Sequence, residues 1–205
     1  LRRTKPVSYR PDSLYGAYWS VVTHDLIQEV ENKPDIYSSS YTRGGITIGD
    51  ALGEREFPNF IAMDRPRHTE QRKVVQPAFN PSEMLRRTVE IKRRTKELFE
   101  GLPRGEVFNW VNHVSVPLTI GMLCILFDFP WEERHDLKRW SDWASEVTPD
   151  TSEERRARYL EQMFQMLARF DGILADKKAK PAADDLLSRM IHSDAMGNMD
   201  DMERL

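Results

Sequence analysis

The sequence predicts a mainly α-helical fold with one small β-hairpin sheet near its start. Three observations support this fold class. Apolar residues recur at helical spacing through much of the chain, above all over residues 159–174. The run 114–129 is apolar around all sides of a helix, and a turn-rich segment joins two short strand-like segments before residue 23.

The first elements are a hairpin and a short helix. Residues 7–10 and 17–22 read as strands on either side of the turn at 11–16. Residues 25–32 then form an amphipathic pattern, and Pro34 lies just beyond it. Its inward-facing residues are expected to be Leu26, Ile27 and Val30.

A long connection and a long helix follow. Residues 38–59 are rich in Ser and Gly, and a loop of this length in a compact domain is usually functional. Asn80, with Pro81 and Glu83 after it, predicts the start of a helix that runs to about residue 99. The stripe expected to face inward consists of Leu85, Val89, Lys92, Lys96 and Phe99.

The remaining elements are helices. A short extended stretch at 106–110 precedes the apolar run 114–129, which predicts a buried helix, and a further helix starts at 130–133 and continues through Trp143. After a break at 148–152, the capping-box residues Thr151 and Glu154 open the longest helix, which Pro181 ends. Its apolar positions are Tyr159, Leu160, Met163, Phe164, Leu167, Phe170 and Leu174. A last short helix spans 184–191.

Composition narrows the function classes. The 205 residues, 40% of them hydrophobic and 31% charged, suit an ordinary globular domain. A net charge of −3 gives no general case for nucleic-acid binding. The single cysteine, Cys124, excludes an internal disulfide and favours a cytoplasmic setting. The longest apolar run is shorter than the roughly 20 residues of a transmembrane segment.

The run 60–79 carries the main functional signal. Asp64 can cap a helix that Pro66 helps to start and Pro77 stops. On that helix His68 and Arg72 stand four residues apart, so they lie on one face about one turn from each other. An imidazole beside a guanidinium suits an anionic partner such as a pair of carboxylates or phosphates. On spacing alone, a solvated basic helix end explains the pair as well.

The string Met-Asp-x-Pro-x-His-Thr-x-x-Arg, followed by Pro-Ala-Phe, closely resembles the helix that crosses one haem face in soluble bacterial cytochromes P-450. The resemblance implies heme b (iron protoporphyrin IX) as cofactor, with His68 and Arg72 on its propionates. Buried propionates need partners that both compensate charge and donate hydrogen bonds, as these two side chains do.

The order of elements is similar to the N-terminal half of the cytochrome P-450 fold. Residues 1–205 would be one incomplete domain, from the first hairpin to just before the long central helix. The family's acid–alcohol pair, its E-x-x-R motif and its haem-ligating cysteine are not in this segment. Cys124 is not that ligand, because no F-x-x-G precedes it. The segment therefore holds no catalytic residue and no metal ligand.

The connection before the motif resembles one P-450 subgroup. Residues 44–50, with 57–61 behind them, are similar to enzymes that hydroxylate terminal carbons of alkanes and fatty acids. Ile61 and Met63 are expected to contact haem. The expected substrate contacts are Ile46, Ile48, Phe57 and Phe60. An apolar tunnel can bind an alkane by buried area alone, although these residues equally suit packing of the loop against the domain.

The resemblance implies a haem-thiolate monooxygenase that uses O2 and receives electrons from a ferredoxin and its ferredoxin reductase. Its substrate would be a small apolar molecule, a medium-chain alkane or fatty acid. A basic patch for an acidic ferredoxin is expected at Arg65, Arg67, Lys73, Arg86 and Arg87, with a solvated helix face as the alternative.

Two other readings remain open. One is a cytochrome P-450 for another lipophilic substrate, such as a terpene, which would leave the fold and the haem contacts unchanged. The other is a haem-free helical binding module in which the His68 and Arg72 pair is coincidental. Haem content and substrate binding distinguish the three readings.

Overall fold

The computed structural model describes residues 2–43, 45–46, 60–145 and 151–199. These residues form two compact units. The first unit holds the described residues up to Arg72, together with 151–153 and Met199, and the second holds 73–145 and 154–198. The single domain expected from the sequence stays a prediction.

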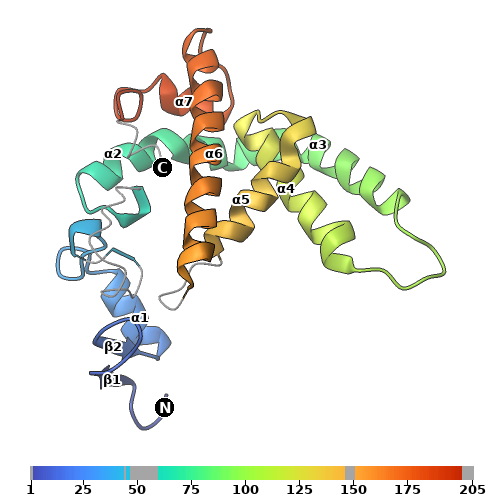
Figure 1. The fold of residues 1–205 in the computed structure, drawn as a ribbon. Helices are drawn as coiled ribbons and strands as arrows, with labels where there is room; N and C mark the ends of the chain where they lie inside the picture. Colours follow the sequence, from blue (N-terminus) through green and yellow to red (C-terminus); the bar gives the residue numbers. More distant parts are fainter. Residues whose placement is uncertain (1, 44, 47–59, 146–150, 200–205) are drawn as a thin grey trace. The chain divides into compact units, whose positions relative to one another are not determined.

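The first unit begins with the predicted hairpin. Strands β1 (Val7–Arg10) and β2 (Tyr18–Val21) pair in antiparallel register (Figure 1). Tyr9 lies opposite Trp19, and their ring centroids are 5.0 Å apart. Gly16 adopts a φ of 86°, a left-handed conformation that favours glycine, and its N–H donates to the Ser13 carbonyl. The hairpin prediction is confirmed.

Helix α1 (His24–Glu31) follows within one residue of its predicted bounds. Leu26 and Val30 are half-buried, as expected, but Ile27 is 40% exposed. The prediction for Ile27 was wrong, because it lies about 100° around the helix from Leu26 while contact covers only a narrow i, i+4 stripe. The short helix η1 (Tyr41–Arg43) comes next.

The predicted His/Arg helix is α2 (Arg67–Val75), preceded by the 3-10 helix η3 (Phe60–Ala62). Another 3-10 helix, η4 (Gln76–Phe79), follows α2 and contains Pro77, at the point where the α-helix was expected to stop. Helix α2 therefore has the extent that the sequence predicts.

In the second unit, α3 (Pro81–Glu100) begins and ends as predicted. The predicted inward stripe is wrong, since Leu85 is 72% and Val89 77% exposed. The buried face lies one position away in register. It contains Arg87 together with the half-buried Met84, Ile91 and Leu98. Both sets have helical spacing, so the packing partner decides between them: Arg87 donates to the Ile125 carbonyl of the neighbouring helix α4.

The middle of the second unit is also helical. Residues 107–109 have no regular structure, and the extended stretch predicted at 106–110 gives way to helix at Trp110. The π-helix η5 (Val111–Ser115) leads into α4 (Val116–Phe127). The 3-10 helix η6 (Trp131–Glu133) then leads into α5 (Arg134–Ser145), which confirms a helix start at 130–133.

Two more helices complete the second unit. Helix α6 (Glu153–Lys178) is the predicted longest helix, and it ends before Pro181. Phe164, one of the apolar positions at helical spacing, is 66% exposed, because Met163, Met166 and Phe170 occupy the side that packs on the core. Helix α7 (Leu186–Ile191) starts at the Asp185 cap, whose carboxylate accepts from the Ser188 N–H at 2.8 Å.

The core of the second unit gathers around one side of α4. Its buried members are Ile120, Cys124, Phe129, Leu137, Trp140, Ile173, Leu174, Leu187 and Ile191. Helix α4 is buried at Ile120, Gly121 and Cys124 and exposed at Thr119, so the predicted burial on all sides does not hold in this unit. Burial raises the pKa of the Cys124 thiol, which therefore behaves as a small apolar side chain.

None of the described helices is both long and apolar enough to cross a membrane.

Candidate functional site

Helix α2 presents His68 and Arg72 one turn apart. The His68 N–H donates to the Asp64 carbonyl at 3.1 Å, which starts the helical hydrogen-bond ladder here. His68 is half-buried and Arg72 exposed. Neither side chain forms an ion pair with a carboxylate of the described residues. Both donors are therefore available to an anion that the described chain does not supply.

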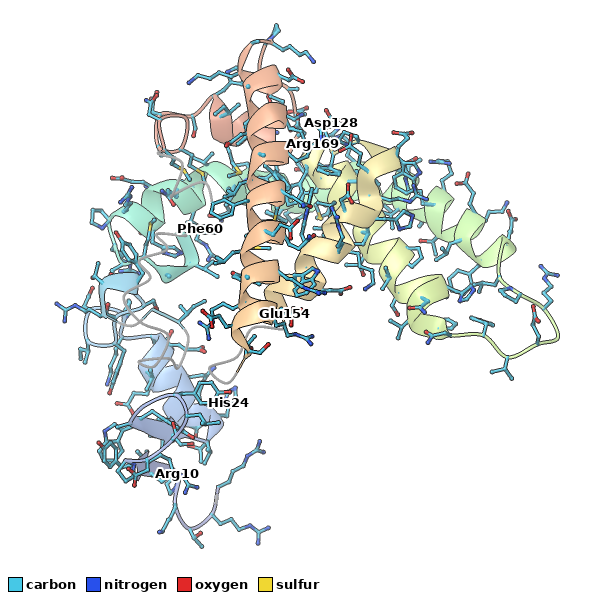
Figure 2. The ribbon with its side chains drawn as sticks, viewed as in Figure 1. Arg10, His24, Phe60, Asp128, Glu154 and Arg169 are labelled. Atoms are coloured by element: carbon cyan, nitrogen blue, oxygen red, sulfur yellow. The ribbon has the colours of Figure 1, made fainter. Side chains whose placement is uncertain are left out.

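Phe60 fixes the plane of the imidazole. Its ring stacks on that of His68 with centroids 5.8 Å apart and an interplanar angle of 11°. Phe60 belongs to the first unit, and its side chain is labelled in Figure 2. The sequence placed Phe60 against substrate, whereas the structure pairs it with a residue predicted to bind the cofactor. A stacked ring orients the two imidazole nitrogens without using either as a hydrogen-bond partner.

Asp64 ties the start of α2 to an earlier segment. One carboxylate oxygen accepts from the Ser38 hydroxyl at 2.5 Å and the other from the Ser39 N–H at 2.9 Å. The Ser38 hydroxyl, followed by the Ser39 N–H, holds the pKa of Asp64 below its ordinary 3.8. The predicted cap is thus corrected, because this carboxylate binds residues 38–39 while its own backbone carbonyl starts the helix.

The apolar residues before α2 divide by exposure. Ala62 and Met63 are buried, while Ile61 is 53% and Ile46 55% exposed. Exposed aliphatic side chains of this kind are available for contact with an apolar ligand or cofactor. The remaining two predicted substrate contacts, Ile48 and Phe57, lie outside the described residues. Met63 is enclosed by the described residues, and its expected contact with haem stays a prediction.

Gln71 is a residue that the sequence did not single out. It is 2% exposed, and its side-chain carbonyl oxygen has no hydrogen-bond partner among the described residues. Buried amide oxygens are normally paired, so this acceptor marks a polar position beside the site. The only sequence signal for it is its place three residues after His68 on the same helix.

The predicted basic patch is corrected at Arg87. This residue is 7% exposed and donates to the carbonyls of Ile125 and Asp184, so it is a structural side chain. Arg86 is exposed but paired with Glu83 at 2.7 Å. Arg65, Arg67 and Lys73 are exposed. A ferredoxin surface built on these three residues stays a prediction.

No protein-family model matches the sequence. Solved structures match it closely. One cytochrome P450 of the 153 type, from Novosphingobium aromaticivorans, shares 44% identity over 98% of this chain and 51% of its own, with a TM-score of 0.88. Another, CYP153D17 from Sphingomonas sp. PAMC 26605, shares 48% identity over 99% of this chain and 51% of its own, also with a TM-score of 0.88.

The chain belongs to the cytochrome P450 superfamily. Curated relatives agree with the structures. Linalool 8-monooxygenase from Pseudomonas putida is 31% identical over 90% of this chain and 47% of its own length. A putative cytochrome P450, YjiB from Bacillus subtilis, is 28% identical over 96% of this chain and 48% of its own. The chain therefore spans about half the length of these P450 relatives.

P450 enzymes carry haem, and the site fits one end of that group. Propionates require hydrogen-bond donors and a compensating charge; Arg72 offers a guanidinium and His68 a ring N–H, and neither has a carboxylate partner among the described residues. Cys124 does not fit the role of axial ligand, because it is buried among apolar side chains and its pKa is raised. Among the described residues, no cluster of three or more potential metal ligands occurs.

Proposed function

We propose that the full-length protein containing this chain is a haem-thiolate monooxygenase that hydroxylates a medium-chain alkane or fatty acid at its terminal carbon. It uses O2 and electrons from a ferredoxin, itself reduced by a ferredoxin reductase. The observation that carries the haem part is the His68 and Arg72 pair, two donors on one face without an internal carboxylate. The substrate part rests on the resemblance of residues 44–50 and 57–61 and on 44–48% identity with two P450 structures of the 153 type.

In this proposal the chain binds the haem propionates and provides apolar surface for the substrate. Arg72 would hold one propionate through its guanidinium, and His68 would donate to the other while the stacked Phe60 ring orients the imidazole. Ile46 and Ile61 offer aliphatic surface to an unfunctionalised chain. When bound, a thiolate-ligated haem supplies the activation of O2 and the insertion of one oxygen atom into a C–H bond.

A terpene is the second candidate substrate. Linalool 8-monooxygenase shares 31% identity with 90% of this chain, and its name specifies a terpene alcohol. The two candidates differ in what the pocket must recognise. A terpene alcohol brings a hydroxyl that gains from a hydrogen-bond partner, whereas an alkane offers apolar area only.

The first experiment tests for haem and substrate together. The full-length protein is purified, reduced and exposed to CO, and we expect the red-shifted Soret band that is characteristic of a thiolate-ligated haem. Octane and linalool are then titrated against the oxidised protein, and the products of turnover are identified. We expect the lower dissociation constant for octane and 1-octanol as the main product. A protein without haem would contradict the proposal, and tighter linalool binding with 8-hydroxylation would favour the second candidate.

The electron-donor part is tested separately. Arg65, Arg67 and Lys73 are exposed cations, and exchange of such residues on a charged surface mainly lowers the association rate. We expect Arg65→Gln with Lys73→Gln to raise the KM for an acidic ferredoxin by about tenfold at low salt, with an unchanged CO spectrum. An unchanged KM would place the ferredoxin on another surface.

A further inference from the structure

A small cavity lies in the second unit between α3, α4 and the start of α5. Its volume is about 220 Å³. The apolar part of its wall comes from Leu98 on α3 and from Leu118 and Met122 on α4. Its charged lining consists of two guanidiniums, Arg94 and Arg134, and one carboxylate, Glu97. An apolar wall beside more cations than anions is the arrangement expected for an amphiphile with an anionic head.

The indole of Trp131 is held firmly at this cavity. A Cβ at Gly121 would meet Cη2 of the indole at 3.2 Å, so the absence of a side chain there lets the ring rest against α4. The guanidinium carbon of Arg94 lies 3.8 Å from the centre of the Trp131 ring, and that of Arg134 lies 4.8 Å from it. Two like charges on one ring are held close together.

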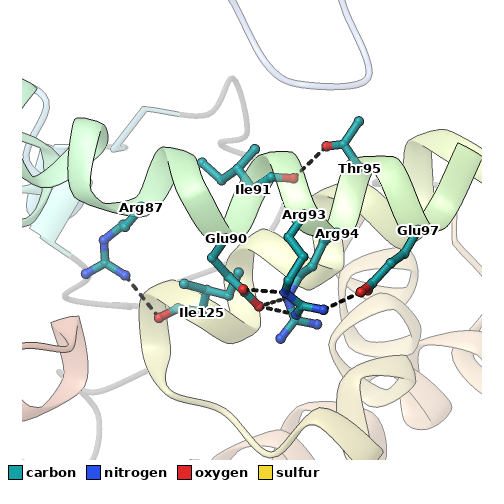
Figure 3. A network of polar contacts seen from close by, with 8 residues as sticks. All are labelled: Arg87, Glu90, Ile91, Arg93, Arg94, Thr95, Glu97 and Ile125. Carbon is teal, nitrogen blue, oxygen red and sulfur yellow. Dashed lines mark hydrogen bonds and ion pairs between the residues drawn. The ribbon is translucent and has the colours of Figure 1, made fainter.

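Carboxylates compensate only part of this charge. Glu90 accepts from Arg93 and Arg94, and Glu97 accepts from Arg93 (Figure 3). Arg134 donates to the Trp131 carbonyl at 2.9 Å and has no carboxylate partner among the described residues. Among the described residues, Arg134 is therefore the cation of the cavity wall that has no carboxylate partner. A bound monoanion would supply the carboxylate partner that Arg134 lacks.

We propose that this cavity binds a small monoanionic amphiphile, a medium-chain carboxylate, with its head on Arg134 and its first methylenes against Leu98, Leu118 and Met122. The volume is smaller than the roughly 300–1,000 Å³ of pockets for drug-sized ligands, so it suits a head group and a short length of chain. Each buried methylene should improve binding about fourfold. The inference does not rest on the proposed monooxygenase function, because it concerns binding within the second unit.

The test uses the full-length protein labelled with 5-fluorotryptophan, and the Trp131 resonance in the ¹⁹F spectrum is assigned with Trp131→Phe. Octanoate, octanol and acetate are titrated in turn. We expect a saturable shift of the Trp131 resonance with octanoate and at least about tenfold weaker binding of octanol and acetate. Equal binding of octanol would overturn the anionic part of the proposal, equal binding of acetate would overturn the amphiphile part, and no saturable shift would overturn both.

Variants locate the head group. Arg134→Gln should weaken octanoate binding about tenfold, whereas Arg134→Lys should keep most of the affinity because the charge remains. Arg158→Gln, which removes an exposed cation paired with Glu154 on α6, is the matched control and should leave binding unchanged. Circular dichroism shows whether each variant is folded. Full affinity in a folded Arg134→Gln protein would exclude this site for the carboxylate.

Discussion

Two helices of this chain carry arginines with different neighbours one turn away, and the neighbours leave these arginines in different states. On α3, Arg93 has Glu90 three residues before it and Glu97 four residues after it, and it pairs with both. On α2, the residue four positions before Arg72 is His68, and no described carboxylate pairs with either. Figure 3 shows the satisfied network of α3.

The difference separates cations that serve the fold from cations that are available to a ligand. The paired arginines hold the pKa of Glu90 at about 2, with Arg93 as the main cause and Arg94 as a further one. An arginine whose guanidinium N–H groups already donate to carboxylates has few donors left for an external anion. An arginine beside a histidine keeps its donors, and the second donor adds geometric selectivity for a pair of carboxylates.

The largest effect is expected on haem retention, when the His68 and Arg72 pair of α2 is removed. Replacement of His68 and Arg72 by alanine removes both proposed propionate donors. We expect haem retention in the full-length protein to fall at least about tenfold, because a charge-assisted hydrogen bond is roughly twice as strong as a neutral one. Retention is measured as the ratio of Soret to protein absorbance after gel filtration.

The matched control is the double replacement Arg93→Ala with Glu97→Ala on α3, which also removes two polar side chains four residues apart. It should leave haem retention unchanged. Equal haem loss in both double variants would mean that helix stability, and not a propionate contact, sets retention.

A second prediction concerns Arg87, the guanidinium that sequence alone placed on the surface. Its two carbonyl partners, Ile125 and Asp184, would be left without this donor in Arg87→Ala. We expect a loss of about 2 kcal/mol in unfolding free energy, measured by urea denaturation. The neighbouring Arg86→Ala removes an exposed, locally paired arginine and should have a much smaller effect. Equal effects would contradict the buried role.

A third prediction sharpens the role of Asp64. Asp64→Asn leaves a weaker acceptor for Ser38 and Ser39, and we expect amide exchange at Ser39 to speed up about tenfold.

The same contact should depend on pH. The pKa of Asp64 is lowered on folding, so the stability that its carboxylate contributes is present above the ordinary value of 3.8 and is lost as pH falls through the lower folded value. In wild-type protein, Ser39 exchange corrected for the intrinsic pH effect should therefore rise only below about pH 3.8. Slow exchange in the variant would contradict this account.

The smallest effect is expected on the α3 side. Arg93→Gln removes both ion pairs of an exposed side chain, and such pairs contribute little because solvent screens them. We expect the melting temperature to shift by less than about 2 °C. A larger shift, measured by circular dichroism, would show that the α3 network does more for the fold than its exposure suggests.

The sequence predicted where elements lie better than which face each buries. Hairpin and helix bounds follow from turn residues, prolines and caps, which act locally, and these predictions held for β1, β2, α1 and α3. The buried face of α3 did not follow. Leu85 and Arg87 lie on opposite sides of the helix, each in a set of residues with helical spacing, and the α4 carbonyl that selects the side of Arg87 comes from 38 residues away.

The candidate site shows the same division. The four-residue spacing of His68 and Arg72 is local, so the pair was predictable from the motif. Two other contacts depend on the path of the intervening chain. They are the stacking of Phe60 on His68 and the hydrogen bonds that Asp64 accepts from Ser38 and Ser39. Gln71 was missed because nothing in its sequence neighbourhood distinguishes a buried amide from an exposed one.

The most direct test of the central claim is a structure of the full-length protein with haem bound. We predict that one propionate accepts from the Arg72 guanidinium and the other from His68, at distances of about 2.7–2.9 Å. The Phe60 ring should remain stacked on His68, and Arg93 should keep its two glutamates. Propionates held by other residues, with Arg72 left in solvent or paired with a carboxylate of the protein, would contradict the account.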